Sequence, residues 1–406
     1  MLSSIARVIA NISPIIIVVV FSKFTSVEQL GDLNYFIALI TLLGVFSDFG
    51  IPEAIQTFLP KQKNKTVTPY LVMEFALVAI TAVAVFIIDR ISGGEFARNQ
   101  LTLLVVITLA SAANTVIIVY NGLLERTRMA IYYLGSAITL LAVTFGLFWG
   151  MHLDSVDSFL WGRLISWVIF LLVPMIDLYI SGHLRWEFKL PLEQLRFTFN
   201  NFLVRAFYTL TFQWDTLLVS FSSGAYVTGY FRTVALAANM PLVLATFINT
   251  KLLPEFSLYA HERKFAKLDA IYRKYLLLIF GLAAGTVIVS IPLAHWGLST
   301  LFSTEIADAG SSAFVLLFIS AWLYVISIPA LTLLQALTRD GFLVLASAVQ
   351  AVVFVVLSTV LYPQLGLAVV PALLIGVNAL FALTLIIGAH YLLSLANVGG
   401  SDNFTK

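Results

Sequence analysis

Three ionisable side chains stand inside two long apolar stretches of the chain. Arg205 and Asp215 lie in the first stretch, and Arg232 lies in the second. An ionisable group at hydrocarbon depth costs at least about 2.5–3.5 kcal/mol, so it persists where it meets water, a ligand or a counter-charge. Arginine also donates strongly to phosphate oxygens. We expect these residues either to line a central cavity for an anionic, lipid-linked cargo or to form an internal Arg–Asp bridge.

Two asparagines and a third arginine extend this predicted polar set. Arg7 and Asn11 are four residues apart, hence on one face of the first apolar span. Asn239 follows Arg232 by seven residues and lies on nearly the same helical face. Arg7 is either a further phosphate ligand or an anchor that reaches the cytoplasmic surface. We expect Asn11 and Asn239 to be polar groups of the cavity.

Carboxylates in apolar surroundings are candidates for ion coupling. Asp48 lies in the segment SDFGIPEAI, and Glu53 follows beyond Gly50 and Pro52. Coupling to H+ or Na+ requires a carboxylate that is neutralised in one state and paired in another. Asp48 and Asp215 are the candidates. The alternative for Asp48 is a fixed salt bridge, or a cap where the helix breaks.

Five other polar residues favour structural roles. Glu74 is close enough to a span end to be wet, and Asp177 ends a span where it reaches cytoplasmic water. Arg163 begins a span and can extend outward along it. Asn114 and Asn121 lie within one span, where amides more often join helices than bind ligands.

The composition is that of a polytopic membrane protein. Hydrophobic residues make up 60% of the chain and charged residues 11%, against roughly 25% charged in soluble domains. The absence of cysteine excludes disulfides and thiolate chemistry. The histidines show no metal-ligand spacing, and no GK[ST] phosphate loop is present. We therefore expect no enzyme, cofactor or metal site, and a net charge of +2 gives no indication of a nucleic-acid partner.

Apolar segments of about twenty residues predict twelve membrane-spanning helices. Their approximate ranges are 2–22, 33–58, 70–88, 100–121, 129–150, 158–180, 199–221, 226–250, 274–297, 311–337, 342–361 and 367–392. The second is long for one span, which tilt or a kink at Pro52 would accommodate. The connector 252–273 is either an amphipathic surface helix or a solvated loop.

Lysine and arginine are concentrated in alternate connectors. One set of connectors carries nearly all of them, whereas the other carries only Lys23, Arg90 and Arg98. The positive-inside rule therefore places both termini in the cytoplasm. The predicted organisation is an N-terminal six-helix lobe over 1–180, a cytoplasmic linker over 181–197, a C-terminal six-helix lobe over 198–392 and a cytoplasmic tail over 393–406.

Four segments resemble the multidrug/oligosaccharidyl-lipid/polysaccharide (MOP) exporter superfamily, and within it the polysaccharide-unit (O-antigen, Wzx-type) flippases. They are LGDLNYFIALITLLGVFSDFGIPEAIQTFLPK at 30–61, FQWDTLLVSFSSGAYVTGYFRTVALAANMPL at 212–242, LLPEFS at 252–257 and ALTRDG at 336–341. The resemblance covers nearly the whole chain. It implies an all-α polytopic fold in which two lobes form a V around a central cavity.

The resemblance also implies a function. Such flippases move an undecaprenyl-pyrophosphate-linked oligosaccharide from the cytoplasmic to the periplasmic leaflet of the bacterial inner membrane, as in O-antigen and lipopolysaccharide biosynthesis. Arg232, Arg205 and Arg7 would then bind the pyrophosphate. The expected partners are this lipid-linked glycan, membrane lipid and a polysaccharide polymerase machinery.

Two other functions stay open. A multidrug or cation antiporter of the same superfamily would favour net negative charge in its cavity, whereas this core offers Arg205 and Arg232 against Asp215. A membrane scaffold or polysaccharide polymerase fits less well, because a polymerase would carry a large periplasmic loop and the predicted outward connectors are short.

Overall fold

The computed structural model describes residues 2–61, 66–91, 100–184, 191–337 and 339–398. All regular elements in these ranges are helical. The middle of the predicted linker, 185–190, and the predicted tail beyond 398 lie outside the described residues.

Contacts divide the chain into two compact units, Met1–Gln213 and Trp214–Lys406. The boundary falls inside a helix, so the first half of that helix belongs to the first unit. The predicted lobe, linker and tail boundaries stay a prediction.

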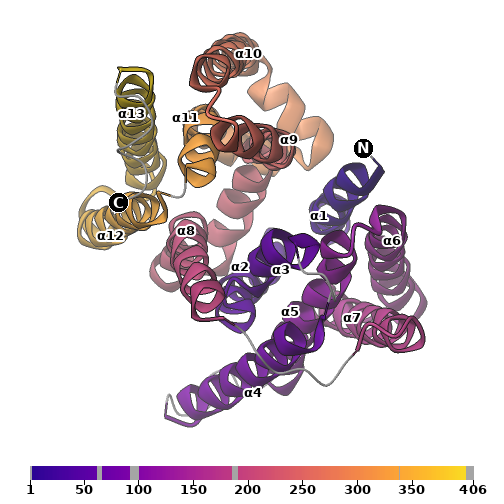
Figure 1. Cartoon of the computed structure of the whole chain (residues 1–406). Helices are drawn as coiled ribbons and strands as arrows, with labels where there is room; N and C mark the ends of the chain where they lie inside the picture. The colour runs from indigo at the N-terminus through magenta and orange to yellow at the C-terminus, as the bar shows by residue number, and fades with distance from the viewer. Residues whose placement is uncertain (1, 62–65, 92–99, 185–190, 338, 399–406) are drawn as a thin grey trace. The chain divides into compact units, whose positions relative to one another are not determined.

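The first unit is built around α5. This helix packs against five others of the unit, α2, α3, α4, α6 and α7, while α1 packs on α6 and α6 on α7 (Figure 1). The helices of the first unit are α1 (Leu2–Phe21), α2 (Val27–Asp48), α3 (Ile51–Phe58), the short 3-10 helix η1 (Leu59–Lys61), α4 (Thr68–Ile91), α5 (Gln100–Gly122), α6 (Arg126–Gly150), α7 (Ser155–Ile180) and the first half of α8 (Leu192–Ala238).

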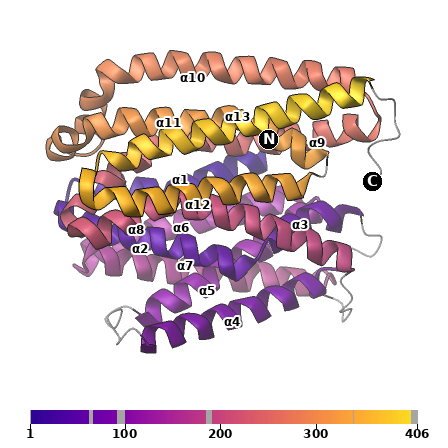
Figure 2. The same ribbon diagram turned by 90° about the vertical axis from the view of Figure 1, so that its left-hand side faces the viewer.

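The second unit is built around α11, which is its most buried long helix and packs against α9, α10 and α13. In Figure 2 these long helices run alongside one another. After the second half of α8, the unit contains α9 (Pro241–His261), α10 (Phe265–Leu301), α11 (Thr304–Ala336), α12 (Asp340–Leu365) and α13 (Val369–Val398).

Length and composition qualify eight helices of the described residues as membrane spans, with α8 and α9 counted as one continuous stretch. Two shorter apolar helices, Ala6–Phe21 and Thr68–Val83, add to them. In hydrocarbon, helices satisfy their own backbone hydrogen bonds, which is why apolar segments of this length fold this way.

The helix ends differ from the predicted ones at three places. The span expected over 33–58 is two helices, α2 and α3, separated at Phe49 and Gly50, and Pro52 lies in the first turn of α3. Gly224 has non-helical backbone angles and interrupts α8 between the spans predicted over 199–221 and 226–250, as expected, but the second of these spans is itself divided, because α8 ends at Ala238 and α9 starts at Pro241. The connector 252–273 forms no separate helix, because α9 continues to His261 and α10 starts at Phe265.

Candidate functional site

The first unit contains an ion-paired arginine at the break between α2 and α3. Arg205 of α8 places Nη1 2.8 Å from Asp48 Oδ2 and 3.3 Å from Glu53 Oε1. Asp48 is the last residue of α2 and Glu53 lies in the first turn of α3. One guanidinium therefore joins three helices, and the cluster formed by these three side chains carries one positive and up to two negative charges.

The break itself brings the two carboxylates to Arg205. Phe49 and Gly50 both have positive φ, 44° and 77°, so the chain turns sharply between the helices. Phe49 stacks on Phe202 with ring centroids 4.2 Å apart. A Cβ on Gly50 would collide with the Thr198 carbonyl oxygen. Because Thr198, Phe202 and Arg205 follow at i, i+4 and i+7, they share one face of α8, and the turn docks beside the arginine.

The three side chains of this cluster differ in accessibility. Asp48 is 4% exposed, whereas Arg205 and Glu53 are 34% and 31% exposed. Asp48 is therefore the buried anchor of the arginine, and a second hydrogen bond from the Gly50 N–H reaches its Oδ1 at 3.3 Å. Arg205 and Glu53 form the accessible edge, where an outside ion can exchange for a partner.

Further polar groups surround this cluster. Arg7, Arg205 and Glu53 all lie within electrostatic range of the buried Tyr133, whose hydroxyl donates to Asn114 Oδ1 at 3.0 Å. Arg7 of α1 and Arg205 of α8 thus approach the same tyrosine. The side chain of Asn11 lies outside the described residues.

Glu74 is more deeply buried than the sequence indicated. We expected a wet carboxylate near a span end, but the side chain is fully buried and accepts a hydrogen bond from Ser111 Oγ at 2.5 Å. It lies within electrostatic range of Asp48 and Arg205. Packing of α4 on α5 covers it, and helix packing is not visible in the local sequence.

The second unit contains a different arginine–aspartate pair. Arg232 Nη1 lies 3.8 Å from Asp215 Oδ1, and the two side chains are 5% and 3% exposed. The Asp215 carboxylate also accepts from the backbone N–H and the hydroxyl of Thr216, at 2.6 and 3.0 Å. This geometry is the internal bridge that the sequence left open for Asp215. Asn239 lies in the turn between α8 and α9 and is partly exposed.

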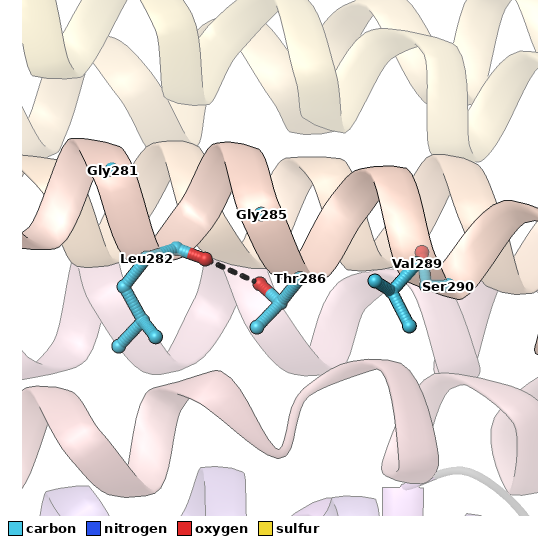
Figure 3. Close-up of a pocket in the computed structure, with 6 residues that line it drawn as sticks. All are labelled: Gly281, Leu282, Gly285, Thr286, Val289 and Ser290. Atoms are coloured by element: carbon cyan, nitrogen blue, oxygen red, sulfur yellow. Dashed lines mark hydrogen bonds between the residues drawn. The ribbon is translucent and has the colours of Figure 1, made fainter.

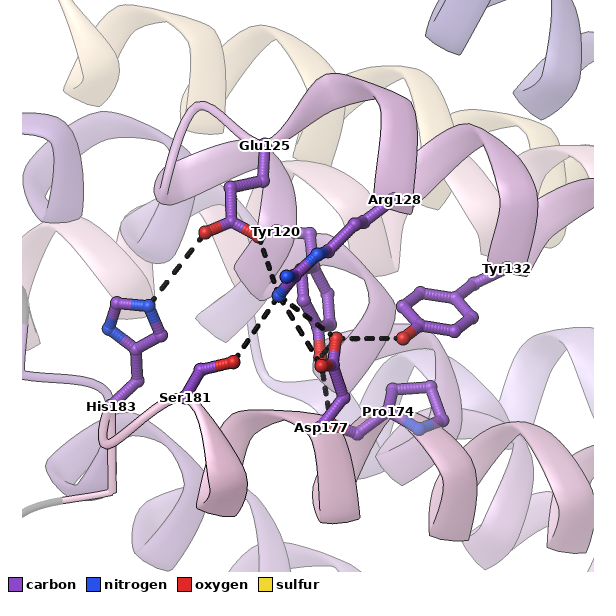
Figure 4. A network of polar contacts seen from close by, with 8 residues as sticks. All are labelled: Tyr120, Glu125, Arg128, Tyr132, Pro174, Asp177, Ser181 and His183. Atoms are coloured by element: carbon purple, nitrogen blue, oxygen red, sulfur yellow. Dashed lines mark hydrogen bonds and ion pairs between the residues drawn. The ribbon is translucent and has the colours of Figure 1, made fainter.

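A second polar network ties together the ends of α5, α6 and α7 (Figure 4). Asp177 accepts hydrogen bonds from the hydroxyls of Tyr120 and Tyr132, each at 2.8 Å, and pairs with Arg128 at 3.2 Å. Arg128 also pairs with Glu125 at 3.1 Å. As expected, Asp177 reaches water, because its side chain is 26% exposed. Its contacts with Tyr120 and Tyr132 also link α7 to α5 and α6.

Asn121 also joins helices, as expected. Its side chain donates to Gln56 Oε1 at 2.9 Å and so links α5 to α3. Together with the Tyr133–Asn114 bond, this contact confirms the structural interpretation of both asparagines.

A shallow pocket on α10 is lined by one helix alone (Figure 3). Its walls are Gly281, Leu282, Gly285, Thr286, Val289 and Ser290. The Thr286 hydroxyl donates to the Leu282 carbonyl oxygen at 2.8 Å and is therefore already satisfied within the helix. The lining carries no charge, so this pocket offers nothing to an ionic cargo.

The predicted site residues therefore fall into two groups. Arg205, Asp48 and Arg7 share the polar region of the first unit, and Asp215 and Arg232 form the buried pair of the second. The sequence analysis assigned Arg205 and Asp48 to separate roles and missed that they pair. It also missed Glu53 as a partner, although the Gly–Ile–Pro segment between the two acidic residues indicated a helix break.

Comparison with known structures defines the class of fold. The chain is similar to an inward-facing multidrug resistance MATE family transporter of the MOP superfamily (TM-score 0.76, 16% identity, covering 97% of this chain and 96% of that one). It is also similar to a MOP superfamily transporter from Pyrococcus furiosus whose binding pocket is described as having reverse polarity (TM-score 0.71, 14% identity, coverage 98% and 95%). A mutant of the Vibrio cholerae MATE transporter VcmN matches as well (TM-score 0.68, 14% identity, coverage 99% and 99%). The fold is thus the all-α polytopic fold of these membrane transporters, as predicted.

Comparison of the sequence with family models assigns the chain to a family. Residues 1–260 match the family model for polysaccharide biosynthesis proteins, which is well over half of the chain. The chain therefore belongs to the polysaccharide biosynthesis protein family. No curated protein sequence matches it significantly. The predicted resemblance to the MOP exporters is confirmed by the family and the fold together.

Proposed function

We propose that this protein is a flippase that moves an undecaprenyl-pyrophosphate-linked oligosaccharide from the cytoplasmic to the periplasmic leaflet of a bacterial inner membrane by alternating access. The polysaccharide biosynthesis family supports a glycan-linked cargo. Hydrated sugars and a diphosphate cross hydrocarbon at high cost, so a protein must offer them polar partners. A glycan cargo of this kind would serve the assembly of surface polysaccharide such as O-antigen.

The observation that carries the proposal is the accessible arginine of the first unit. Arg205 is 34% exposed although apolar helices surround it, and Arg7 approaches the same tyrosine, Tyr133. A guanidinium fork binds phosphate oxygens bidentately and keeps its charge at every physiological pH. Arg232 is 5% exposed and already paired, so Arg205 is the better candidate for first contact with the diphosphate.

Ion coupling fits the same cluster. In the structure, Arg205 is held by Asp48 and Glu53, which compete with any incoming phosphate. Neutralising one carboxylate with a proton weakens its hold on the arginine and favours phosphate binding. We propose Asp48 and Glu53 as the coupling pair, with Glu53 exchanging first because it is the more exposed.

A multidrug or cation antiporter is the second candidate. The MATE fold is shared with multidrug resistance transporters, and the cluster around Arg205 holds more carboxylates than arginines. A cationic substrate would then displace Arg205 from Asp48 and Glu53 instead of binding to the arginine.

The two functions predict opposite phenotypes for one set of strains. We expect deletion of the gene to abolish surface polysaccharide and to leave susceptibility to cationic drugs unchanged. Arg205→Gln should give the same loss of polysaccharide, because the diphosphate loses its donor. Arg196→Gln is the matched control, since Arg196 is an exposed arginine nine residues earlier on the same helix.

Protein stability has to be separated from function in this experiment. Arg205→Gln leaves Asp48 buried without its cation, so the double variant Arg205→Gln/Asp48→Asn is tested beside it. Membrane-inserted protein is quantified for each strain. Normal polysaccharide in a strain with the well-inserted double variant, or increased drug susceptibility with normal polysaccharide on deletion, would refute the flippase proposal.

A further inference from the structure

Arg163 of α7 is a partly buried cation for which the described residues provide no counter-charge. No carboxylate of these residues lies within ion-pair distance of it. Its Nε is buried without a hydrogen-bond partner. The sequence suggested that this side chain extends outward to the membrane surface, and its position in the structure differs.

The neighbours of Arg163 are aromatic. The guanidinium carbon lies 5.2 Å from the centroid of the Phe159 ring and 5.5 Å from that of the Trp167 ring, one helical turn away on either side. An aromatic face attracts a desolvated cation. It replaces neither the N–H acceptors nor the full hydration of an arginine, whose burial is costly.

The indole of Trp167 has the same deficit. Its Nε1 is also buried without a hydrogen-bond partner. Two neighbouring side chains thus present unsatisfied N–H donors and one full positive charge, and both need an acceptor. Buried polar groups in native proteins are rarely left in this state, and a bound ion beside a positive charge is one arrangement that satisfies them.

Helix geometry limits the size of that ligand. Phe159, Gly162 and Ser166 are buried on α7, whereas Trp161 and Ile165 are exposed. At 100° per residue, Arg163 points to the buried side of the helix, away from the exposed Trp161 and Ile165. A lipid headgroup would have to enter the packed interior of the first unit, and a small ion has no such requirement. The residue remains partly accessible, so an ion can reach it.

From these contacts we infer that Arg163 and Trp167 form a binding site for a small inorganic anion inside the first unit. The guanidinium supplies the charge and the indole N–H a second donor, while Phe159 shields the far side. The anion compensates the buried charge and so stabilises the helix bundle. This site shares no residue with the cluster around Arg205, and its role does not depend on the proposed cargo.

The test measures thermal stability of the purified full-length protein. Chloride, bromide or phosphate is titrated at constant ionic strength against a large organic anion that cannot enter. We expect the melting temperature of the wild type to rise and saturate with at least one small anion, because a ligand that binds only the folded state stabilises it. Halide saturation would identify a monovalent ion, and saturation by phosphate alone an oxyanion.

Two variants and a control assign the effect to the site. Arg163→Met should abolish the anion-dependent rise, and without small anions it should melt no lower than the wild type, since an uncompensated charge has been removed. Trp167→Phe keeps the ring and loses the donor, which should weaken apparent affinity about tenfold. Arg196→Met should respond like the wild type. No rise in the wild type, or an unchanged rise in both Arg163→Met and Trp167→Phe, would overturn the inference.

Discussion

At the residue scale, the two intramembrane arginines of α8 have different surroundings. Arg205 pairs with two carboxylates and stays 34% exposed, whereas Arg232 pairs with Asp215 and is 5% exposed. A buried pair costs both ions their hydration, and it therefore contributes little net stability while making each partner indispensable to the other. Accessibility makes Arg205 a ligand candidate and burial makes Arg232 a structural one.

The Asp215–Arg232 pair can be tested by removing its partners singly and together. Asp215→Asn or Arg232→Met alone should destabilise the protein by about 3–5 kcal/mol, because each leaves a buried charge uncompensated. The double variant should recover most of that loss. Thermal unfolding of the purified variants measures both effects.

The double variant also decides between the two roles of Arg232. If the pair is structural, the double variant transports normally once it folds. Complete loss of surface polysaccharide from a stable double variant would instead assign the pair a role in transport, with Arg232 binding the cargo as the family resemblance implies or Asp215 coupling an ion.

At the element scale, the break between α2 and α3 determines the geometry of the candidate site. Two consecutive residues with positive φ turn the chain, and the turn packs on the face of α8 that carries Arg205. Without this break, a continuous helix would place Asp48 and Glu53 five residues apart and about 140° around its axis, so one guanidinium could not easily reach both. Gly50 permits the turn through its conformational freedom and its lack of a side chain.

Gly50→Ala should therefore disturb the Arg205–Asp48–Glu53 cluster, although Gly50 is not itself one of its charged residues. Its φ of 77° is unfavourable for alanine, and the added Cβ would collide with the Thr198 carbonyl oxygen. We expect a loss of about 1–3 kcal/mol in stability together with reduced transport. Gly44→Ala is the control, because Gly44 lies within α2 and a Cβ there meets no atom within 4 Å. Equal melting temperatures for the two variants would show that the break tolerates a side chain.

At the scale of the whole molecule, the distribution of charge predicts the orientation in the membrane. Lysine and arginine are concentrated in alternate connectors, and the positive-inside rule then assigns the α6–α7 turn to the periplasm and the end of α7 to the cytoplasm. The network around Asp177 and Arg128 would accordingly lie at the cytoplasmic end (Figure 4).

The native chain contains no cysteine, which makes this orientation directly measurable. Met151→Cys and Ser181→Cys introduce single thiols at exposed positions near opposite ends of α7. A membrane-impermeant thiol reagent should label the first variant in intact spheroplasts, and the second only after the membrane is permeabilised. The reverse pattern would place both termini in the periplasm.

Much of this protein follows from the sequence alone. Its membrane class, its family and most of its helices follow from apolar segments of sufficient length, because each helix in hydrocarbon satisfies its backbone hydrogen bonds locally. Pro52 and Gly50 likewise indicated a kink in the second span, although not the two separate helices that result.

The pairing of charges was decided by the tertiary structure. Asp215 lies ten residues from Arg205 yet pairs with Arg232, and Arg205 instead reaches Glu53, 152 residues away. Glu74 is buried because α4 packs against α5, a contact that its own segment does not encode. Ion pairs between helices depend on which faces meet and at what height. That is a property of the packed bundle, and the local sequence that forms each helix leaves it undetermined.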